Sequence, residues 1–523
     1  MKRTKSKSLT LLSAFGQIGF LTGISRVSGF FRDIAFASFL GAGLTADALL
    51  VALKLPNMFR RLSAEGAMTN AFLPHFVKIY EEEGKKSAIK LAAEAQIFVI
   101  IVLSCVVGIA EIFMPQVIRL LAPGFVDTPE RLNVAIDLAR ITMPYLPMVS
   151  VTALWVAIAN SYHRFVAGAA VQIIVNICFI IGALAIPFFV SSPDDITAYP
   201  IVGSLLFAGI LQLTLLYLVL KKIDALPQIT WPRISLAGQA MWRKFWPAAL
   251  GAGWMQLNLL VDLILASTLP VGAISWLYYA DRVVQLPLGI IGIALGTALL
   301  PRLSAAELSG GKKEVVETIE EAISLAGFFI IPAVMALIII SKPIISGLFN
   351  YGAFSANDVH MAALAMSAYA IGLPGFVLIK LMQPAFFAAG KPSIVLRISI
   401  ITVLINISGS LILMPNFGHV GLALATSVSG ICAACLLTVI LCRQNRVGSG
   451  NLALLGRIFL ASVVMGISLV AIDLYLRRFF PEFPAVLSLS VLVTTGVAVF
   501  GFFAFTFRAV PGSFLKRLPY LGA

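Results

Sequence analysis

Residues 485–507 read AVLSLSVLVTTGVAVFGFFAFTF, a run without a single charged side chain. An α-helix rises about 1.5 Å per residue, so a run of this length can cross the roughly 30 Å hydrocarbon core of a membrane. Similar runs recur along the 523 residues, broken by charged or turn-rich stretches. The sequence therefore predicts an all-α integral membrane protein.

We expect fourteen transmembrane helices, and charges interrupt the runs of the first two. The basic N-terminal residues do not indicate a cleaved signal peptide, because the apolar run that follows is too long and carries Arg26 and Arg32. The expected spans are 10–38, 43–74, 92–113, 133–158, 166–189, 200–220, 247–268, 273–301, 319–341, 359–387, 394–414, 419–441, 455–475 and 485–507.

The composition excludes several classes of protein. The chain is 59% hydrophobic and 12% charged, with a mean hydropathy of +0.98. Soluble domains carry roughly 25% charged residues, so a soluble enzyme, a nucleic-acid-binding protein and a disordered scaffold are excluded. Cys432 and Cys435 have the spacing of a redox or metal motif, but they lie in an apolar run without a second pair, which favours simple packing. The histidines have no metal-site spacing.

The distribution of Lys and Arg predicts the orientation. With the N-terminus inside, the inside segments hold 24 basic residues and the outside segments hold 5. Cytoplasmic loops carry such an excess, so both termini are expected in the cytoplasm. This bias explains most of the net charge of +14 without nucleic acid.

Two Leu-Pro pairs suggest an internal repeat. Leu73-Pro74 recurs as Leu300-Pro301, and Leu146-Pro147 recurs as Leu373-Pro374, both after 227 residues. We expect two six-helix lobes related by a pseudo-two-fold axis along the membrane normal, plus two C-terminal helices. The expected divisions are an N-lobe at 1–222, a cytoplasmic linker or interfacial helix at 223–246, a C-lobe at 247–442, and 443–523 with spans 13 and 14 and a cytoplasmic tail.

Charged residues inside the spans carry the functional signal. A lipid-exposed charge at the bilayer centre costs roughly 2.5–3.5 kcal/mol, so Arg26, Arg32, Arg60 and Arg282 must face protein or water. Ion pairs are one explanation, and the candidates are Arg26 with Asp33, Arg61 with Glu65, and Asp47 or Asp281 with an arginine. In the first two spans, five basic residues face three acidic ones. The excess predicts a cavity for an anion, and arginine forks suit phosphate.

The spacing of Arg26 and Arg32 leaves two alternatives. At 100° per residue their directions differ by about 240°, so a straight helix would not point both inward. Either the helix bends near Gly29, or one of the two arginines belongs to a structural pair. The chain has no Gly-rich phosphate loop followed by Lys-Ser/Thr, so we expect a transporter without its own ATPase, and no catalytic residues.

Several motifs closely resemble the MurJ (MviN) family, over essentially the whole chain. They are SRVSGFFRD at 25–33, GAG at 41–43, ADA at 46–48, KLPNMFRR at 54–61, AEGA at 64–67, WLYYADR at 276–282, and the Leu-Pro pairs at 286–287 and 300–301.

The resemblance implies the fold of the multidrug/oligosaccharidyl-lipid/polysaccharide exporters. It also implies a flippase, in the bacterial inner membrane, for lipid II, the undecaprenyl-diphosphate-linked precursor of peptidoglycan. It implies alternating access, and a groove for the lipid tail in spans 13 and 14. The implied substrate-binding residues are Arg26, Arg32, Asp47, Arg60 and Arg282, with Asp33, Asn57, Arg61, Glu65 and Asp281 as secondary candidates. Gln285 stands where some relatives carry Glu, which leaves the surroundings of Arg282 more positive.

No organic cofactor is expected. The resemblance implies a candidate sodium site at Asp262, Asn406 and Ser410, although a buried Asp near Asn is equally explained as structural; sodium or the membrane potential would drive transport. Expected partners are lipid II, membrane lipids and cell-wall synthesis proteins, with a monomeric chain. The alternatives are a flippase for another polyprenyl-linked glycan, a drug exporter, and a membrane enzyme acting on polyprenyl diphosphates. The drug exporter fits the arginine excess poorly, and the enzyme lacks an Asp cluster beyond Asp194-Asp195.

Overall fold

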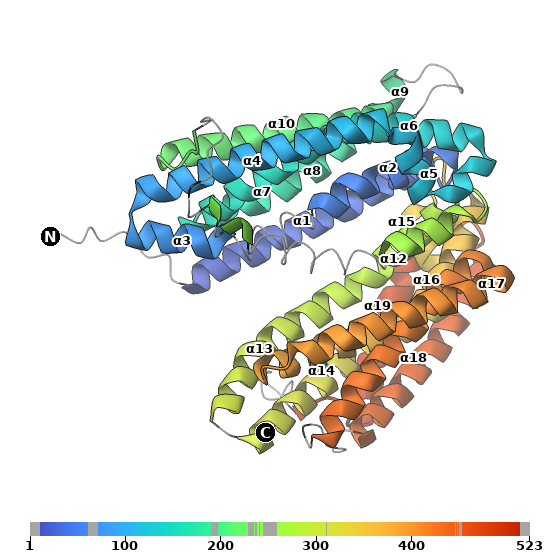
Figure 1. Cartoon of the computed structure of the whole chain (residues 1–523). Coiled ribbons are helices and arrows are strands. Elements are labelled where there is room, and N and C mark those ends of the chain that lie inside the picture. Colours follow the sequence, from blue (N-terminus) through green and yellow to red (C-terminus); the bar gives the residue numbers. More distant parts are fainter. Residues whose placement is uncertain are drawn as a thin grey trace. The chain divides into compact units, whose positions relative to one another are not determined.

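The computed structural model describes residues 11–60, 72–189, 197–228, 235, 238–239, 241–243, 259–309, 311–444, 446, 448 and 452–512. Within these residues the chain forms helices and no strands, so the predicted all-helical class is confirmed (Figure 1). The chain divides into two compact units, Met1–Gly272 and Ala273–Ala523. This division follows the seventh expected span, whereas the sequence places the start of the second lobe before that span.

Unit 1 is a bundle of helices joined by short connections. Its elements are α1 (Leu11–Leu40), α2 (Leu44–Arg60), α3 (Leu73–Glu82), α4 (Lys85–Ile112), α5 (Met114–Leu121), η2 (Pro123–Asp127), α6 (Pro129–Thr142), α7 (Tyr145–Ser161), α8 (Phe165–Leu184), α9 (Ile186–Phe189) and α10 (Tyr199–Lys222), and residues 259–267 are also helical.

Unit 2 contains longer helices and two breaks in regular geometry. Its elements are α12 (Ala273–Pro287), the π-helical turn η3 (Leu288–Gly292), α13 (Ile293–Leu308), α14 (Lys312–Ile339), α15 (Ser341–Phe349), α16 (Ala356–Ala388), α17 (Pro392–Arg443), α18 (Leu452–Phe479) and α19 (Ala485–Thr506).

The helix bounds repeat along the chain with the period of the Leu-Pro pairs. Adding 227 to the bounds of α4 gives those of α14, and adding 227 to the start of α6 and the end of α7 gives those of α16. The start of α17 likewise lies 227 residues after the start of α8. The two units therefore contain a common order of helices with nearly equal lengths.

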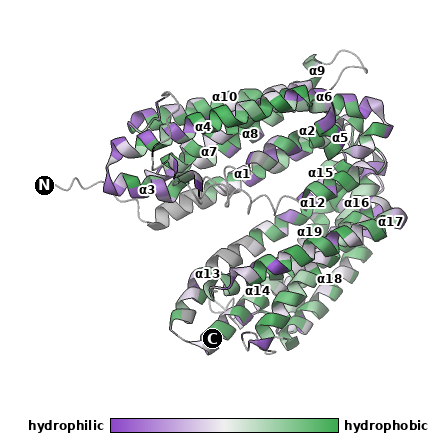
Figure 2. Ribbon diagram, viewed as in Figure 1, coloured by the Kyte–Doolittle hydropathy of each residue, from purple (hydrophilic) through white to green (hydrophobic). Residues whose placement is uncertain are grey.

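The long helices have the length and composition of membrane spans. Among the described residues, eight helices qualify, or nine if α6 and α7, bent by 41°, form one span. Hydrophobic residues cover most of α4, α8 and α10, whereas hydrophilic residues gather on α3 (Figure 2). The 52 residues of α17 would extend about 78 Å if straight. The backbone leaves helical geometry at Gly418, with φ 55° and ψ −132°, between the two spans expected there.

The described part of the linker between the lobes packs onto α4. Ser235 donates to Glu94 Oε2 from its amide nitrogen at 3.1 Å and from its hydroxyl at 2.7 Å. Trp242 is buried with its ring centroid 4.0 Å from that of Phe98. Trp242 is therefore part of the hydrophobic core of unit 1, a position that differs from the interfacial one its composition suggests.

Small residues allow α16 and α17 to pack closely. A Cβ at Gly372 would lie 2.6 Å from Ser427 Cα, and one at Gly375 would lie 2.8 Å from the Ile431 nitrogen. Both neighbours are backbone atoms, so the helices themselves would have to separate. Close approach at small residues is the usual means by which membrane helices associate, because lipid gives no hydrophobic drive between them.

We predict that Gly375→Ala destabilises the protein by about 1–3 kcal/mol, because the added methyl overlaps the α17 backbone. Gly456→Ala in α18 is the matched control, since nothing lies within 4 Å of its added Cβ. Thermal unfolding of the purified proteins in detergent measures both changes. Equal melting temperatures for the two variants would contradict the close packing of α16 and α17.

Candidate functional site

Arg32 on α1 is held by two partners. Its Nε and Nη2 donate to Asp33 Oδ1 at 3.0 and 2.7 Å, and its Nη1 donates to Asn176 Oδ1 at 3.1 Å. The Arg32 side chain is 14% exposed and that of Asp33 is 3% exposed. The guanidinium also lies 5.8 Å from the ring centroid of Phe179 on α8. Arg32 is thus fixed in position and largely enclosed.

Asn176 on α8 is a site residue that the sequence analysis missed. While its oxygen accepts from Arg32, its Nδ2 donates to the Ser25 carbonyl at 2.9 Å and to Ser28 Oγ at 3.0 Å. One buried amide therefore fixes both the middle of α1 and the Arg32 side chain. The signal in the sequence was a lone Asn within an apolar run, which has no periodic pattern to mark it.

The arrangement of α1 decides between the alternatives for Arg26 and Arg32. The helix is continuous through Gly29, and Arg32 forms the ion pair with Asp33. Arg26, by contrast, is exposed. Arg32, and not the expected Arg26, is therefore the ion-pair partner of Asp33, and the Arg26 side chain is exposed.

Asp47 lies in a second ion pair, which is fully buried. Its Oδ2 accepts from Arg131 Nη2 at 2.6 Å and from the Gly272 amide at 2.7 Å, and the two side chains are 0% and 2% exposed. The guanidinium also stacks 3.9 Å from the ring centroid of Phe125, and Nη1 lies 3.5 Å from the Leu269 carbonyl oxygen. Asp47 thus connects α2 to α6 and to the segment before unit 2.

Unit 2 has a polar contact at the equivalent place. The residue 227 positions after Arg131 is Asp358. Asp358 is the third residue of α16, as Arg131 is the third residue of α6. Asp358 Oδ1 accepts from Trp276 Nε1 of α12 at 2.8 Å, and its Oδ2 accepts from Ser355, which caps the helix. Each unit is therefore tied at the same corner by one buried polar contact. Asp47 belongs to this framework, and its place among substrate ligands rests on the family resemblance alone.

The remaining candidates of α2 lie at its end. Arg60 is the last residue of α2 and is half-buried. Asn57 is exposed, and its Nδ2 donates to the Leu53 carbonyl at 3.0 Å. Arg61 and Glu65, with the ion pair expected between them, lie outside the described residues.

Arg282 lies on α12 of unit 2, half-buried, with its guanidinium 4.7 Å from the ring centroid of Tyr278. Its neighbour Asp281 accepts a hydrogen bond from Gln285 Nε2 one turn later. A glutamate at this position would instead repel Asp281. Gln285, which stands where some relatives carry Glu, therefore donates a hydrogen bond to Asp281 in this chain.

The candidate sodium ligands lie in both units. Asp262 is half-buried in unit 1, and Asn406 and Ser410 are buried one turn apart on α17 of unit 2. No group of three or more His, Cys, Asp or Glu side chains suited to a metal occurs among the described residues. The sodium site stays a prediction.

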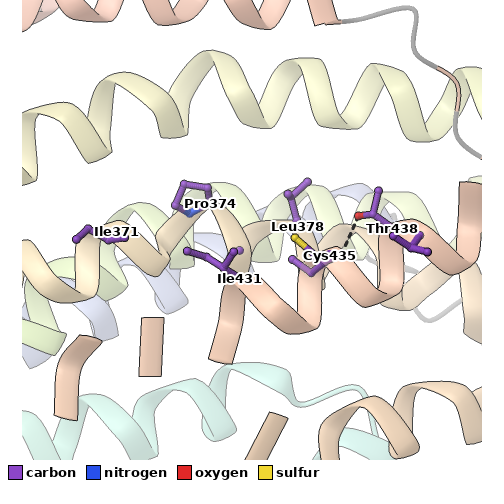
Figure 3. Close-up of a pocket in the computed structure, with 9 residues that line it drawn as sticks. Ile371, Pro374, Leu378, Ile431, Cys435 and Thr438 are labelled. Atoms are coloured by element: carbon purple, nitrogen blue, oxygen red, sulfur yellow. Dashed lines mark hydrogen bonds between the residues drawn. The ribbon is translucent and has the colours of Figure 1, made fainter. Parts of the chain in front are cut away.

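A cavity of about 470 Å³ lies between α16 and the second half of α17 (Figure 3). Ile371, Pro374 and Leu378 face Ile431, Cys435 and Thr438 across it. Thr438 already donates its hydroxyl hydrogen to the Ala434 carbonyl at 2.8 Å. An apolar lining of this kind offers no cation to a phosphate, so the cavity is not the anion site.

Comparison with known proteins gives a consistent family. The sequence model described as "Lipid II flippase MurJ" matches residues 36–494. A "Probable lipid II flippase MurJ" of Rickettsia prowazekii is 33% identical over 510 residues, which cover 96% of this chain and 99% of the relative. A protein of the same description from Rhizobium tropici is 36% identical over 438 residues, covering 84% and 82%.

Solved structures agree in fold. "Lipid II flippase MurJ, inward closed conformation" superposes with a TM-score of 0.78 at 25% identity, covering 94% of this chain and 98% of that one. An inward-facing multidrug transporter of the MATE family and MOP superfamily reaches 0.66 at 15% identity, covering 82% and 98%. The second likeness shows a shared fold.

We predict that Asp47→Asn destabilises the protein by about 3–5 kcal/mol, because it leaves the Arg131 charge buried without its counter-charge. The substituted amide oxygen would still accept from the Gly272 amide nitrogen. The loss of stability therefore measures the effect of removing the Asp47 charge alone. Adding Arg131→Met should recover most of the stability. Arg477→Ala, which breaks an exposed ion pair with Asp473, should change it by less than about 1 kcal/mol.

Thermal unfolding and expression level measure these effects. If the double variant were as unstable as Asp47→Asn alone, Asp47 would have a role independent of Arg131.

Proposed function

The chain belongs to the lipid II flippase MurJ family, and we propose that its intramembrane cations bind the diphosphate of lipid II during translocation. The protein is a transporter that moves the lipid-linked peptidoglycan precursor across the membrane, and not an enzyme. Within that function, the roles of single residues, the topology and the energy source are proposals.

The net charge of α1 and α2 is the observation that carries the assignment of the anion site. These helices hold Arg26, Arg32, Lys54 and Arg60 against Asp33 and Asp47. Arg131 of α6 pairs with Asp47, so Asp47 does not offset the basic residues of these two helices. Such an excess inside a membrane favours an anion from outside the protein.

Arginine is the suitable residue for this anion. Its fork donates two parallel hydrogen bonds to phosphate oxygens, and it stays charged at every physiological pH. The sugar-peptide head of lipid II cannot cross hydrocarbon, so it must follow the polar path that the cations mark. The undecaprenyl chain can remain in the bilayer, and the exposed apolar side chains of α18 and α19 support the proposed groove for it.

The repeat of helix bounds after 227 residues supports two lobes of six spans each. The break at Gly418 splits α17 into spans 11 and 12, in keeping with fourteen spans in total. An even number of spans and the excess of Lys and Arg in the inside segments support a cytoplasmic position for both termini. We expect the chain to act as a monomer, beside the enzymes that use lipid II.

Transport of a different polyprenyl-linked glycan is the second candidate, since the cations recognise a diphosphate that both lipids share. The relatives are described as lipid II flippases, which favours lipid II. Depletion of the protein, followed by exposure of lipid II to an external, membrane-impermeant degrading enzyme, separates the two. Undiminished degradation in cells with no other flippase would reject the lipid II assignment.

We predict that Arg60→Ala abolishes growth complementation at unchanged protein level, because α2 loses a fork for the diphosphate. Arg60→Lys should restore growth only in part, since an ammonium is a point charge without the fork. Lys222→Ala at the exposed end of α10 is the control and should complement fully. Full growth with Arg60→Ala would remove Arg60 from the binding site.

The sodium proposal has its own test. If Asp262, Asn406 and Ser410 hold a coupling ion, Asp262→Ala should abolish the dependence of flipping on sodium in reconstituted vesicles. Flipping by the unaltered protein that never depends on sodium would reject the site and leave the membrane potential as the driving force.

A further inference from the structure

We propose that Lys380 on α16 is a further phosphate ligand of unit 2, which meets the lipid diphosphate nearer the cytoplasm than Arg282 does. The proposal rests on the proposed function, because it adds a residue to the same binding path. Lys380 belongs to the basic residues inside the expected spans, and neither the motif pattern nor the repeat assigns it a role.

Lys380 is a charged residue within an expected membrane span. It is exposed, eight residues before the end of α16, which is about 12 Å along the helix. In the part of the chain that the structure describes, no Asp or Glu forms an ion pair with it. An ammonium at this depth is too costly in lipid, so it must reach water or an anion.

The packing around the Lys380 stem shows which neighbours it has. A Cβ at Gly292 would lie 3.8 Å from Lys380 Cγ and 3.7 Å from a methyl carbon of Val377. The stem therefore passes over the buried Gly292, where the π-helical turn η3 ends and α13 begins. Such π-turns are rare and frequently occur at functional sites. The glycine leaves the room in which the lysine stem lies.

The position of Gly292 sets the distance between the two cations. Arg282 precedes Gly292 by ten residues on the α12–η3 segment, which corresponds to about 15 Å of helix. Unit 2 thus has two cations at different levels along the α12–η3 segment. Arg282 belongs to that segment, and Lys380 of α16 lies beside its end at Gly292. In the proposed orientation Lys380 occupies the cytoplasmic level, and a diphosphate entering from that side would meet it first. A lysine suits a first contact, because its flexible ammonium accepts many phosphate orientations.

The test measures lipid binding by native mass spectrometry of the purified full chain, with lipid II and phosphate-free undecaprenol as probes. Lys380→Met keeps the length of the stem without the charge and should weaken lipid II binding by roughly tenfold, the effect of one charge-assisted bond. Lys380→Arg should restore binding. Undecaprenol binding should not change, and Lys342→Met in α15, the matched control, should bind both lipids as the unaltered protein does.

Unchanged lipid II binding by Lys380→Met would overturn the proposal, even if growth were lost, because Lys380 would then act on conformation. Equal losses in Lys380→Met and Lys380→Arg would also overturn it, because the charge would not be the cause. Failure of the proposed function has a different signature. The unaltered protein and Arg282→Ala would then bind lipid II no better than undecaprenol.

Discussion

A charged side chain within hydrocarbon must have a counter-charge, hydrogen-bond partners or water, and this constraint organises the whole protein. Asp47 and Arg131 satisfy it completely, with a 2.6 Å ion pair and an aromatic ring against the guanidinium. Arg32 satisfies it through Asp33 and Asn176. Arg26 and Lys380 are exposed. They satisfy the constraint only where water or an anionic ligand reaches them. Structural and binding cations are thus distinguished by their surroundings and not by residue type.

The repeat shows that the framework can use different chemistry for one purpose. At the same corner, unit 1 uses Arg131 with Asp47, and unit 2 uses Asp358 with Trp276. The second contact has no cation, so a buried ion pair is not required by the fold. In unit 1 the pair has an additional consequence, because it removes the Asp47 charge from the balance of α1 and α2.

Hydropathy predicted the helices well, because lipid demands apolar side chains wherever a helix meets it. The bounds of α19, the end of α4 and the break near Gly418 follow from this demand and from glycine, whereas α4 begins seven residues before the expected span, at the charged Lys85. The partners of the charges were harder to predict. Arg131 reads as an outside-loop residue after Pro129 and Glu130, yet α6 begins at Pro129 and buries it. Its partner lies 84 residues away, and no periodicity reports such a contact. Asn176 escaped prediction for the same reason.

The polar contacts that hold the helices of unit 1 together also bear on how transport is driven. Arg131 and Asp47 fix α2 against α6, and Asn176 fixes α1 against α8, so Arg32 and Arg131 are held by a packed framework. Cations that move little across the membrane contribute little electrical work, and the moving charge is then that of the lipid. Moving one charge through the potential is worth about 2.3 kcal/mol per 100 mV. In a cell that is negative inside, an anion moving outward gains this energy. In the proposed function, a framework that holds its cations in place leaves the membrane potential free to act on the charge of the lipid.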